Sequence, residues 1–325
     1  MKLMRKMTLV ATFALLVHAS VAYGAPNEAG VVASAGSAID NYGFDASGNA
    51  PGKVITNPIG VIPDGVPNFA AVKTAIASSN GILYHNGIIM TAGIKVNIVW
   101  YGNWSNTQKG IIKTMINGLN NSSYYNINST YNDSTNLSVL TKDNNGSPSI
   151  YVGTETNDTN YSQSKTLSDA KVWTLAKTNL AGNNGITLVL TDGSVKESSG
   201  FLTRYCGWHY WGSAGTYTAK YAFIGNPLSN RGCNPQTAKS PNGDTGVDAM
   251  ISVIAHEIVE AATDPDGKGW FDSNGAENAD KCAWTFGTSY SASNGSLANM
   301  KLGGKDYYIQ QNWVNASGGY CALGY

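Results

Sequence analysis

The residues best suited to chemistry lie in VIAHEIVEAATDP, residues 253–265, where His256, Glu257 and Glu260 interrupt an apolar stretch. Their pattern is HExxE. In the zincin pattern His-Glu-x-x-His, two histidines one helical turn apart bind zinc and the adjacent glutamate activates a water molecule. Because a carboxylate oxygen is also a zinc ligand, HExxE predicts His256 and Glu260 as two ligands and Glu257 as the general base.

A zinc site needs at least one more protein ligand, and three residues elsewhere in the chain are candidates. Glu277 and Asp280 follow the HExxE segment at a distance that lets the chain return after a turn, and His209 lies in CGWHY, residues 206–210. Calcium is the alternative metal, because the loop DPDGKGWFD, residues 264–272, offers oxygens around glycine turns without matching an EF-hand. Ordinary turn chemistry accounts for most of these acids.

A second interpretation of the same residues needs no metal. His256 and Glu260 would form a hydrogen bond within the helix, and Glu257 would lie on a solvated edge. An ionisable pair in an apolar helix needs either a partner or a cavity, because an unpaired buried charge is costly. The surroundings of the helix therefore decide between the two interpretations.

The segment DTGVDAMISVIAHEIVEAATDP, residues 244–265, predicts the helix that positions the HExxE residues. Thr245 and Asp248 resemble a capping box at its start, and Pro265 marks its end. Apolar residues occupy both sides of this helix rather than one stripe, which indicates that the helix is buried.

The rest of the chain alternates between strand and helix patterns. Strands are predicted at 94–102, 186–192, 221–227 and 305–314, and helices at 107–119 and 167–180. This alternation indicates an α/β or α+β fold. We expect a single main domain with a mixed sheet, disulfide bonds and a buried, zincin-like HExxE helix.

The N-terminus predicts export. Residues 1–24 run from a basic tip through a short apolar stretch to small residues, which is typical of a secretory signal peptide. Residues 25–80 are rich in Gly, Ala, Pro and Asn and predict a leader with little order, and residues 81–325 predict the compact domain. No later segment sustains the roughly 20 apolar residues of a membrane span, so we expect a secreted, extracellular protein.

Four cysteines lie in the mature region, and an exported chain meets an oxidising compartment. Sequence alone permits three pairings, of which we predict the pairing of neighbours, Cys206 with Cys233 and Cys282 with Cys321. Metal binding by the thiolates is an alternative, but the CxxC spacing of a zinc knuckle is missing.

Charge and glycosylation motifs describe the predicted surface. Loss of Lys2, Arg5 and Lys6 with the signal peptide leaves 18 of the 21 basic residues against 21 acidic residues, so nucleic acid is not an expected partner. Between residues 103 and 162 the chain carries a dense series of Asn-x-Ser/Thr sequons, which predicts a glycoprotein if the host glycosylates.

An ordered series of motifs resembles a known family. The series runs through LYHNGIIMTAGIKVNIVWYGNWSNTQKGIIKTMINGL, LVLTD, CGWH, YAFIGNP, ISVIAHEIVEAATDP, GWFD, GAENADKC and NWVNASGGYC. In this order the motifs resemble the EXORDIUM/phosphate-induced protein family, over about residues 81 to 321. The resemblance implies an extracellular, cell-wall-associated protein of the kind linked in plants to growth and to phosphate or hormone responses.

Two functions follow as expectations. The first is a secreted EXORDIUM-like protein whose metal site hydrolyses a peptide or another cell-surface substrate. The second is a non-catalytic extracellular protein that binds matrix glycans or a receptor. In both cases the expected partner is a component of the extracellular matrix or the cell surface.

Overall fold

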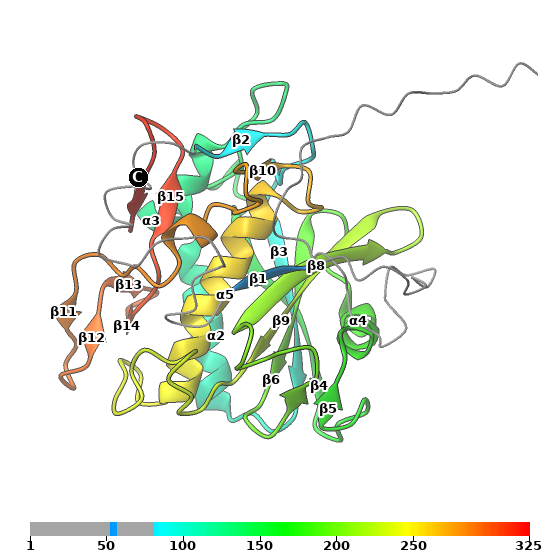
Figure 1. Cartoon of the computed structure of the whole chain (residues 1–325), viewed down its shortest axis with the longest axis vertical. Helices are drawn as coiled ribbons and strands as arrows, with labels where there is room; N and C mark the ends of the chain where they lie inside the picture. The colour runs from blue at the N-terminus through cyan, green and yellow to red at the C-terminus, as the bar shows by residue number, and fades with distance from the viewer. Residues whose placement is uncertain (1–52, 57–80) are drawn as a thin grey trace, which may run out of the picture. The chain divides into compact units, whose positions relative to one another are not determined.

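The computed structural model describes residues 53–56 and 81–325, so the predicted signal peptide and most of the predicted leader lie outside the described residues. The centre of the fold is a six-stranded sheet with the order β1-β8-β9-β6-β3-β4 (Figure 1). Its strands are β1 (Val54–Thr56), β3 (Ile94–Tyr101), β4 (Ile150–Asp158), β6 (Gly185–Thr191), β8 (Gly207–Ser213) and β9 (Thr218–Gly225). Strands β4, β3, β6 and β9 are parallel, whereas β8 is antiparallel to β9 and β1 is antiparallel to β8. The predicted mixed sheet is confirmed.

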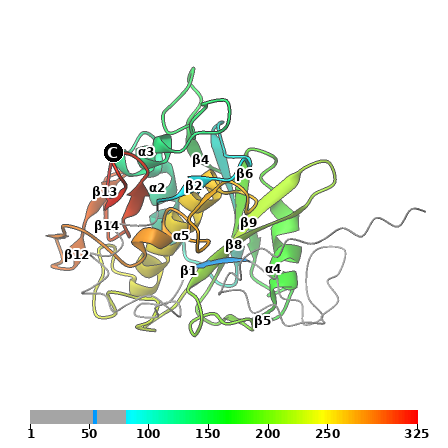
Figure 2. The ribbon, with the colours of Figure 1, turned by 45° about the horizontal axis from the view of Figure 1, so that its top comes forward.

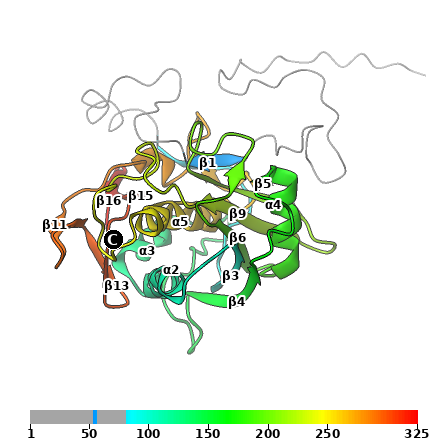
Figure 3. The same ribbon diagram turned by 90° about the horizontal axis from the view of Figure 1, so that it is seen from below.

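Helices cover both faces of this sheet. Seen from below, α2 (Asn106–Leu119) and α5 (Thr245–Thr263) lie on one face and α4 (Asp169–Ala176) lies on the other (Figure 3). The short helix α3 (Ser123–Asn126) follows α2, and the described residues also contain the 3-10 turns η2 (Ile127–Thr130), η3 (Lys177–Asn179) and η4 (Asp280–Cys282). Both predicted helices outside the HExxE segment are thus present.

Two hydrophobic cores form because successive side chains of a strand point to opposite faces. On β3, Ile98 and Trp100 join the core under α2 and α5, whereas Val99 and Tyr101 join the core under α4. Continuous apolar runs such as this one are typical of parallel strands that are covered on both faces. This explains why β3 and β6 were recognisable in the sequence.

The remaining strands form two-stranded ribbons. They are β2 (Leu83–Tyr84) with β10 (Trp270–Phe271), β5 (Thr166–Leu167) with β7 (Lys196–Glu197), β11 (Tyr290–Ser291) with β12 (Leu297–Ala298), β13 (Met300–Leu302) with β14 (Lys305–Tyr307), and β15 (Asn312–Val314) with β16 (Tyr320–Ala322). The single strand predicted over 305–314 is therefore wrong. The Asn299 side chain accepts from Ile309 N and donates to Ile309 O, which holds the segment between β14 and β15 in a loop.

Helix α5 begins and ends close to the predicted positions, but its cap differs. Asp244 is the N-cap and accepts a hydrogen bond from Val247 N, so the predicted capping box is wrong. The Asp248 carboxylate instead accepts hydrogen bonds from residues 240 and 242. The helix ends at Thr263, and every residue from Gly246 to Thr263 is buried, as the apolar pattern on both sides predicted.

Strand β1 falls inside the predicted leader and joins the main sheet at its edge, beside β8 and away from β4 (Figure 2). Its backbone pairs in register with Gly207, Trp208 and His209. None of the helices in the described residues combines the length and apolar character needed to cross a membrane.

Both predicted disulfides are confirmed: Cys206 pairs with Cys233 and Cys282 pairs with Cys321. They close stretches separated by 27 and 39 residues in the sequence. Cross-links of this span stabilise a fold by restricting its unfolded chain.

Removing one cross-link has a measurable expected cost. We expect the double variant Cys206→Ser/Cys233→Ser to lose about 3 to 4 kcal/mol of unfolding free energy, the size given by loop-closure entropy. Urea unfolding under non-reducing conditions measures this loss. The wild type treated with a reductant is the control and should be destabilised at least as much, and an unchanged midpoint in the variant would contradict the expectation.

Candidate metal centre

The HExxE residues lie on the C-terminal half of α5, and all three side chains are fully buried. His256 and Glu260 are one turn apart, so their side chains lie on the same face of the helix. His256 Nε2 is 2.9 Å from Glu260 Oε1 and 3.5 Å from Asp280 Oδ1. The structure therefore brings a third candidate ligand, Asp280, to the predicted pair.

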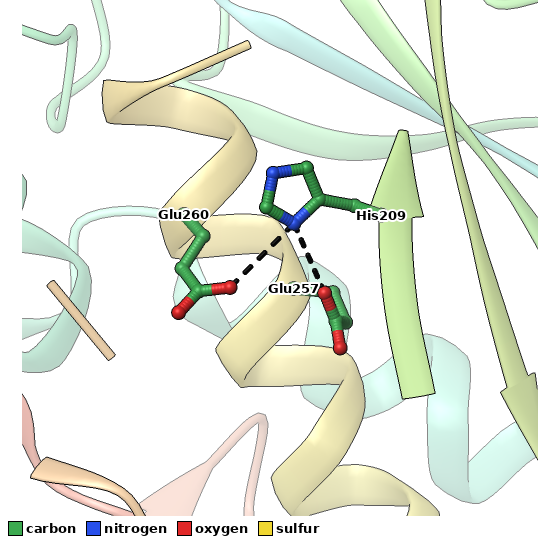
Figure 4. Close-up of side chains that lie close together, drawn as sticks. All are labelled: His209, Glu257 and Glu260. Carbon is green, nitrogen blue, oxygen red and sulfur yellow. Dashed lines mark hydrogen bonds and ion pairs between the residues drawn. The ribbon is translucent and has the colours of Figure 1, made fainter. Parts of the chain in front are cut away.

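His209 approaches the same helix from β8. Its Nδ1 lies 3.0 Å from Glu257 Oε2 and 3.5 Å from Glu260 Oε2, and Figure 4 shows the ring pointing at both carboxylates. Its Nε2 lies 3.7 Å from Glu277 Oε1. Glu260 thus presents one oxygen to each histidine, and the six candidate residues form one cluster that is buried except at Asp280, whose side chain is 19% exposed.

Local structure explains how β8 and α5 come so close. Gly207 and His209 lie on the same face of β8 because side chains alternate along a strand. A Cβ on Gly207 would lie 2.5 Å from Val253 Cγ1 and 3.1 Å from Glu257 Oε1. The absence of a side chain at residue 207 therefore lets α5 pack directly onto β8, which places His209 between Glu257 and Glu260.

The turn that carries Glu277 and Asp280 is tied to α5 by hydrogen bonds. The Asn278 side chain donates to Val259 O at 3.1 Å, and Asp280 N donates to Glu260 Oε1 at 3.1 Å. The Cys282–Cys321 disulfide holds the end of the same turn. Cys206 lies three residues before His209, so each disulfide fixes a segment that supplies side chains to the cluster.

The ligand atoms form two groups that share Glu260. The first is His256, Glu260 and Asp280, the second is His209, Glu257 and Glu260, and the ligand atoms of each group lie within 4.8 Å of one another. Two ligands bound at 2.0–2.1 Å to one tetrahedral zinc lie about 3.3 Å apart. The observed separations between the histidine nitrogens and the glutamate and aspartate oxygens of these groups are 2.9 to 3.5 Å, which brackets that spacing, and the shortest of them are also ordinary hydrogen-bond distances.

Several polar atoms in the cluster are buried without a hydrogen-bond partner, although the separations above are short. These atoms are His209 Nε2, His256 Nδ1 and Nε2, Glu260 Oε2 and Glu277 Oε2. Buried polar atoms are hydrogen-bonded in the great majority of cases, so each exception needs an explanation. A cation bound between the side chains would satisfy those nitrogens and oxygens that face the cluster.

The cluster holds charges of both signs. Burial lowers the pKa of each histidine, but the facing carboxylates outweigh it and raise the pKa of His209 to about 10 and that of His256 well above its usual value. The pKa of Glu277 is raised well above its usual value by burial and by neighbouring carboxylates, among them Asp264 and Glu260. Burial and the Glu260 charge raise the pKa of Asp280 to about 6. Burial opposes ionisation of Glu260, but His256 and His209 lower its pKa to about 2. The metal-free cluster is thus held by ion pairs between histidines and carboxylates, and a bound metal ion would displace protons from both.

Glu257 is not on a solvated edge, so that part of the metal-free interpretation is wrong. Its Oε1 accepts a hydrogen bond from Thr56 Oγ1 at 2.5 Å, and its Oε2 lies against His209 Nδ1 at 3.0 Å. Sequence reasoning missed Thr56, because residues 25–80 had been interpreted as a leader with little order. The available signal was the short β-branched run Lys53–Thr56.

The aspartates of the loop after α5 form the hydrogen bonds to backbone N–H groups that are expected of turn residues. Asp264 Oδ1 accepts from Lys268 N and Gly269 N, both at 2.7 Å. Asp272 Oδ1 accepts two further backbone N–H groups of its own turn, and Asp272 Oδ2 pairs with Lys281 at 3.1 Å. These acids shape the loop beside the cluster, and within the described residues they belong to neither ligand group.

Comparison with known proteins places the same residues inside one conserved region. The model of the phosphate-induced protein 1 conserved region matches residues 82–313. Protein EXORDIUM-like 3 of Arabidopsis thaliana is 31% identical over 302 residues, covering 78% of this chain and 86% of the relative. Protein EXORDIUM of the same plant is 30% identical, covering 60% and 69%, and protein PHOSPHATE-INDUCED 1 of Nicotiana tabacum is 28% identical, covering 58% and 66%. No solved structure matches the chain.

Proposed function

The chain belongs to the phosphate-induced protein 1 family, which includes the EXORDIUM proteins, and from this premise we propose that it is a secreted metal-dependent hydrolase. Its substrate would be a peptide or another cell-surface component. The cluster of His209, His256, Glu257, Glu260, Glu277 and Asp280 would be its active centre. All six residues lie within the conserved region at 82–313.

The observation that carries the proposal is the cluster of histidine nitrogens and carboxylate oxygens a few ångströms apart, several of which are buried without a hydrogen-bond partner. His256, Glu260 and Asp280 would hold the metal, with His209 and Glu277 beside them. Histidine nitrogens combined with carboxylate oxygens favour zinc. When bound, the metal would act as a Lewis acid and lower the pKa of a bound water.

Glu257 would be the general base. Its Oε1 accepts a hydrogen bond from the Thr56 hydroxyl in this structure, and in catalysis it would accept a proton from a substrate water in place of that hydrogen bond. His209, against the other oxygen, fixes the orientation of the carboxylate. The role of Glu257 is thus to hold and transfer a proton, and the roles of His256 and Glu260 are to bind the ion.

Secretion is supported by the two disulfides, since such bonds persist in oxidising compartments. It also agrees with the signal-peptide pattern of residues 1–24. If the host glycosylates, the sequons between residues 103 and 162 would carry the glycans.

A second candidate function is a non-catalytic extracellular protein that binds matrix glycans or a receptor. It is favoured by one observation: both oxygens of Glu257 have partners within the protein. The polar residues of α5 would then stabilise the fold. The two functions differ in their dependence on Glu257 and on metal.

Metal content tests the proposal directly. We expect near-stoichiometric zinc in the purified, secreted protein by elemental analysis, and its loss from a His256→Ala/Glu260→Ala variant, because these residues are two of the proposed ligands. The matched control is Asp272→Asn, which changes a buried acid of the neighbouring loop outside both ligand groups and should keep the metal. Folded wild-type protein that takes up neither zinc nor another divalent ion would overturn the proposal.

A further inference from the structure

The outer edge of β8 is occupied by a separate short segment of the chain. Strand β1 has only three residues and pairs antiparallel with the start of β8, and the Thr56 carbonyl accepts a further hydrogen bond from Cys206 N at 2.7 Å. Backbone pairing of this kind is available to any extended peptide that reaches a free sheet edge. If β1 were absent, β8 would be the edge strand of the main sheet.

One end of this segment inserts an ammonium group into a pocket built by the domain. Lys53 Nζ lies 2.9 Å from both carboxylate oxygens of Asp169 and also donates to Ser199 Oγ. It lies 4.5 Å from the centre of the Tyr205 ring and 5.0 Å from that of Trp208. The carboxylate of Asp169 and the ring of Trp208 are fully buried.

The composition of this pocket matches one kind of ligand group. A carboxylate combined with aromatic ring faces binds a cation by charge and by cation–π attraction. The acceptors surround a single nitrogen, which suits the compact ammonium of lysine, whose three N–H groups can point in different directions. The pocket therefore has the features of a lysine-binding site, filled here by a lysine of the same chain.

The other end of the segment meets the buried cluster. Thr56 lies three residues after Lys53, and its hydroxyl donates to Glu257, the proposed general base. Three residues of extended chain span about 10 Å, so the lysine pocket and Glu257 lie about that distance apart along the same edge of β8. A residue bound at the position of Thr56 would lie next to the proposed metal centre.

We propose that the outer edge of β8 is a peptide-binding site, selective for an extended peptide whose lysine lies three residues before the residue at Glu257. Residues 53–56 occupy this site in cis and compete with a peptide supplied in trans. The pairing and the lysine pocket do not depend on metal. The peptide is a hydrolysis substrate only if the proposed function holds, and in that respect the inference rests on it.

The extent of the family match supports the proposal that residues 53–56 occupy a binding site built by the rest of the domain. The pocket and edge residues, from Asp169 to Glu257, lie within the family's conserved region at 82–313, whereas Lys53 and Thr56 lie before it. The segment is held by a three-residue backbone pairing and two polar side-chain anchors. A cis segment reduces the apparent affinity for a competing peptide to the intrinsic affinity multiplied by the fraction of time for which the site is free.

The test measures peptide binding to the full chain. The probe is a fluorescein-labelled peptide with the sequence PGKVITNP, residues 51–58, followed by anisotropy in a buffer that contains EDTA. We expect the Lys53→Ala/Thr56→Ala variant to bind it at least tenfold more tightly than the wild type, because the cis anchors are gone. A probe with glutamate in place of lysine should bind the variant at least tenfold more weakly. The control Lys113→Ala removes a different lysine–carboxylate pair, the surface pair with Glu155 at 2.9 Å. This variant should bind the probe as the wild type does.

Equal or absent binding of the probe by the folded variant and the wild type would overturn the inference. Hydrogen exchange on the wild type keeps the test decisive if the variant does not fold. A displaceable β1 should exchange its amides at least tenfold faster than β9, and equal protection of the two strands would show β1 to be a permanent part of the sheet. Because the binding assay contains EDTA, it does not depend on metal. Absence of peptide binding would therefore refute the peptide-binding site at β8, whereas absence of metal would refute the proposed function.

Discussion

Replacing Glu260 with alanine is expected to lower the free energy of unfolding by about 3–5 kcal/mol, the cost of breaking a buried ion pair by removing one partner. Glu260 is the residue that both ligand groups share. Without it, His256 loses its nearer carboxylate and keeps only Asp280, His209 keeps only Glu257 beside Nδ1, and neither ligand group is complete. Urea unfolding of the purified protein measures the loss, and zinc should disappear from the same sample.

The matched control is Glu277→Gln. Burial and the surrounding carboxylates raise the pKa of Glu277 well above its usual value, which favours the neutral form in the metal-free protein, and glutamine has nearly the shape and charge of that form. We therefore expect a change of less than about 1 kcal/mol for Glu277→Gln in the presence of EDTA, within the range of a mild substitution. Equal losses in the two variants would show that charge pairing with the histidines is not what Glu260 contributes.

Replacing Glu257 with glutamine is expected to reduce hydrolysis by a factor of roughly 10² to 10⁴, the usual contribution of a general base. Glutamine keeps an oxygen that can accept from Thr56 but cannot take up a proton from water. A quenched-fluorescent library of lysine-containing peptides provides the rate, measured beside metal content and urea stability. We expect the metal to remain, because His256, Glu260 and Asp280 are unchanged.

The control for this prediction is Glu155→Gln, which removes the charge of a partly exposed glutamate paired with Lys113 and should leave the rate unchanged. A Glu257→Gln protein that hydrolyses the library as fast as the wild type would exclude Glu257 as the base. If neither protein hydrolyses any peptide and both bind zinc, the metal would be structural and the non-catalytic candidate function would be favoured.

The two predictions separate binding of the ion from the chemistry. Glu260→Ala removes a ligand, so metal, stability and activity should be lost together. Glu257→Gln removes only the proton acceptor, so activity alone should fall. This difference follows from the geometry, since Glu260 faces both histidines whereas Glu257 faces His209 and Thr56.

The sequence by itself determined the main elements of the fold. The apolar runs of β3 and β6 identified strands that are covered on both faces, and the 3.6-residue periodicity of α2 identified a helix with one buried side, because a buried surface must carry apolar residues. The apolar pattern on both sides of α5 likewise determined that the helix is buried. Export to an oxidising compartment predicted disulfide bonds, and pairing each cysteine with its neighbour in the sequence predicted both of them correctly.

Within the candidate site, the sequence identified the six candidate residues but neither Thr56 nor the arrangement. His256 and Glu260 share a helix face, so their proximity follows from helix geometry alone. The joining of Asp280 to this pair, and the position of His209 between Glu257 and Glu260, depend on how β8 and η4 pack against α5. Those contacts join residues 20 to 51 positions apart in the chain, and no local pattern encodes them.

Only the tertiary structure placed Thr56 on Glu257 and Lys53 in the pocket at Asp169. A three-residue strand gives no periodic signal, and its sequence lies in a segment rich in small residues and turn formers. Its place is fixed by backbone hydrogen bonds to the edge of β8 and by two polar side chains that reach partners more than 100 residues away. Interactions of this range are decided by the assembled sheet, because the edge that binds the strand does not exist until β8 has paired with β9.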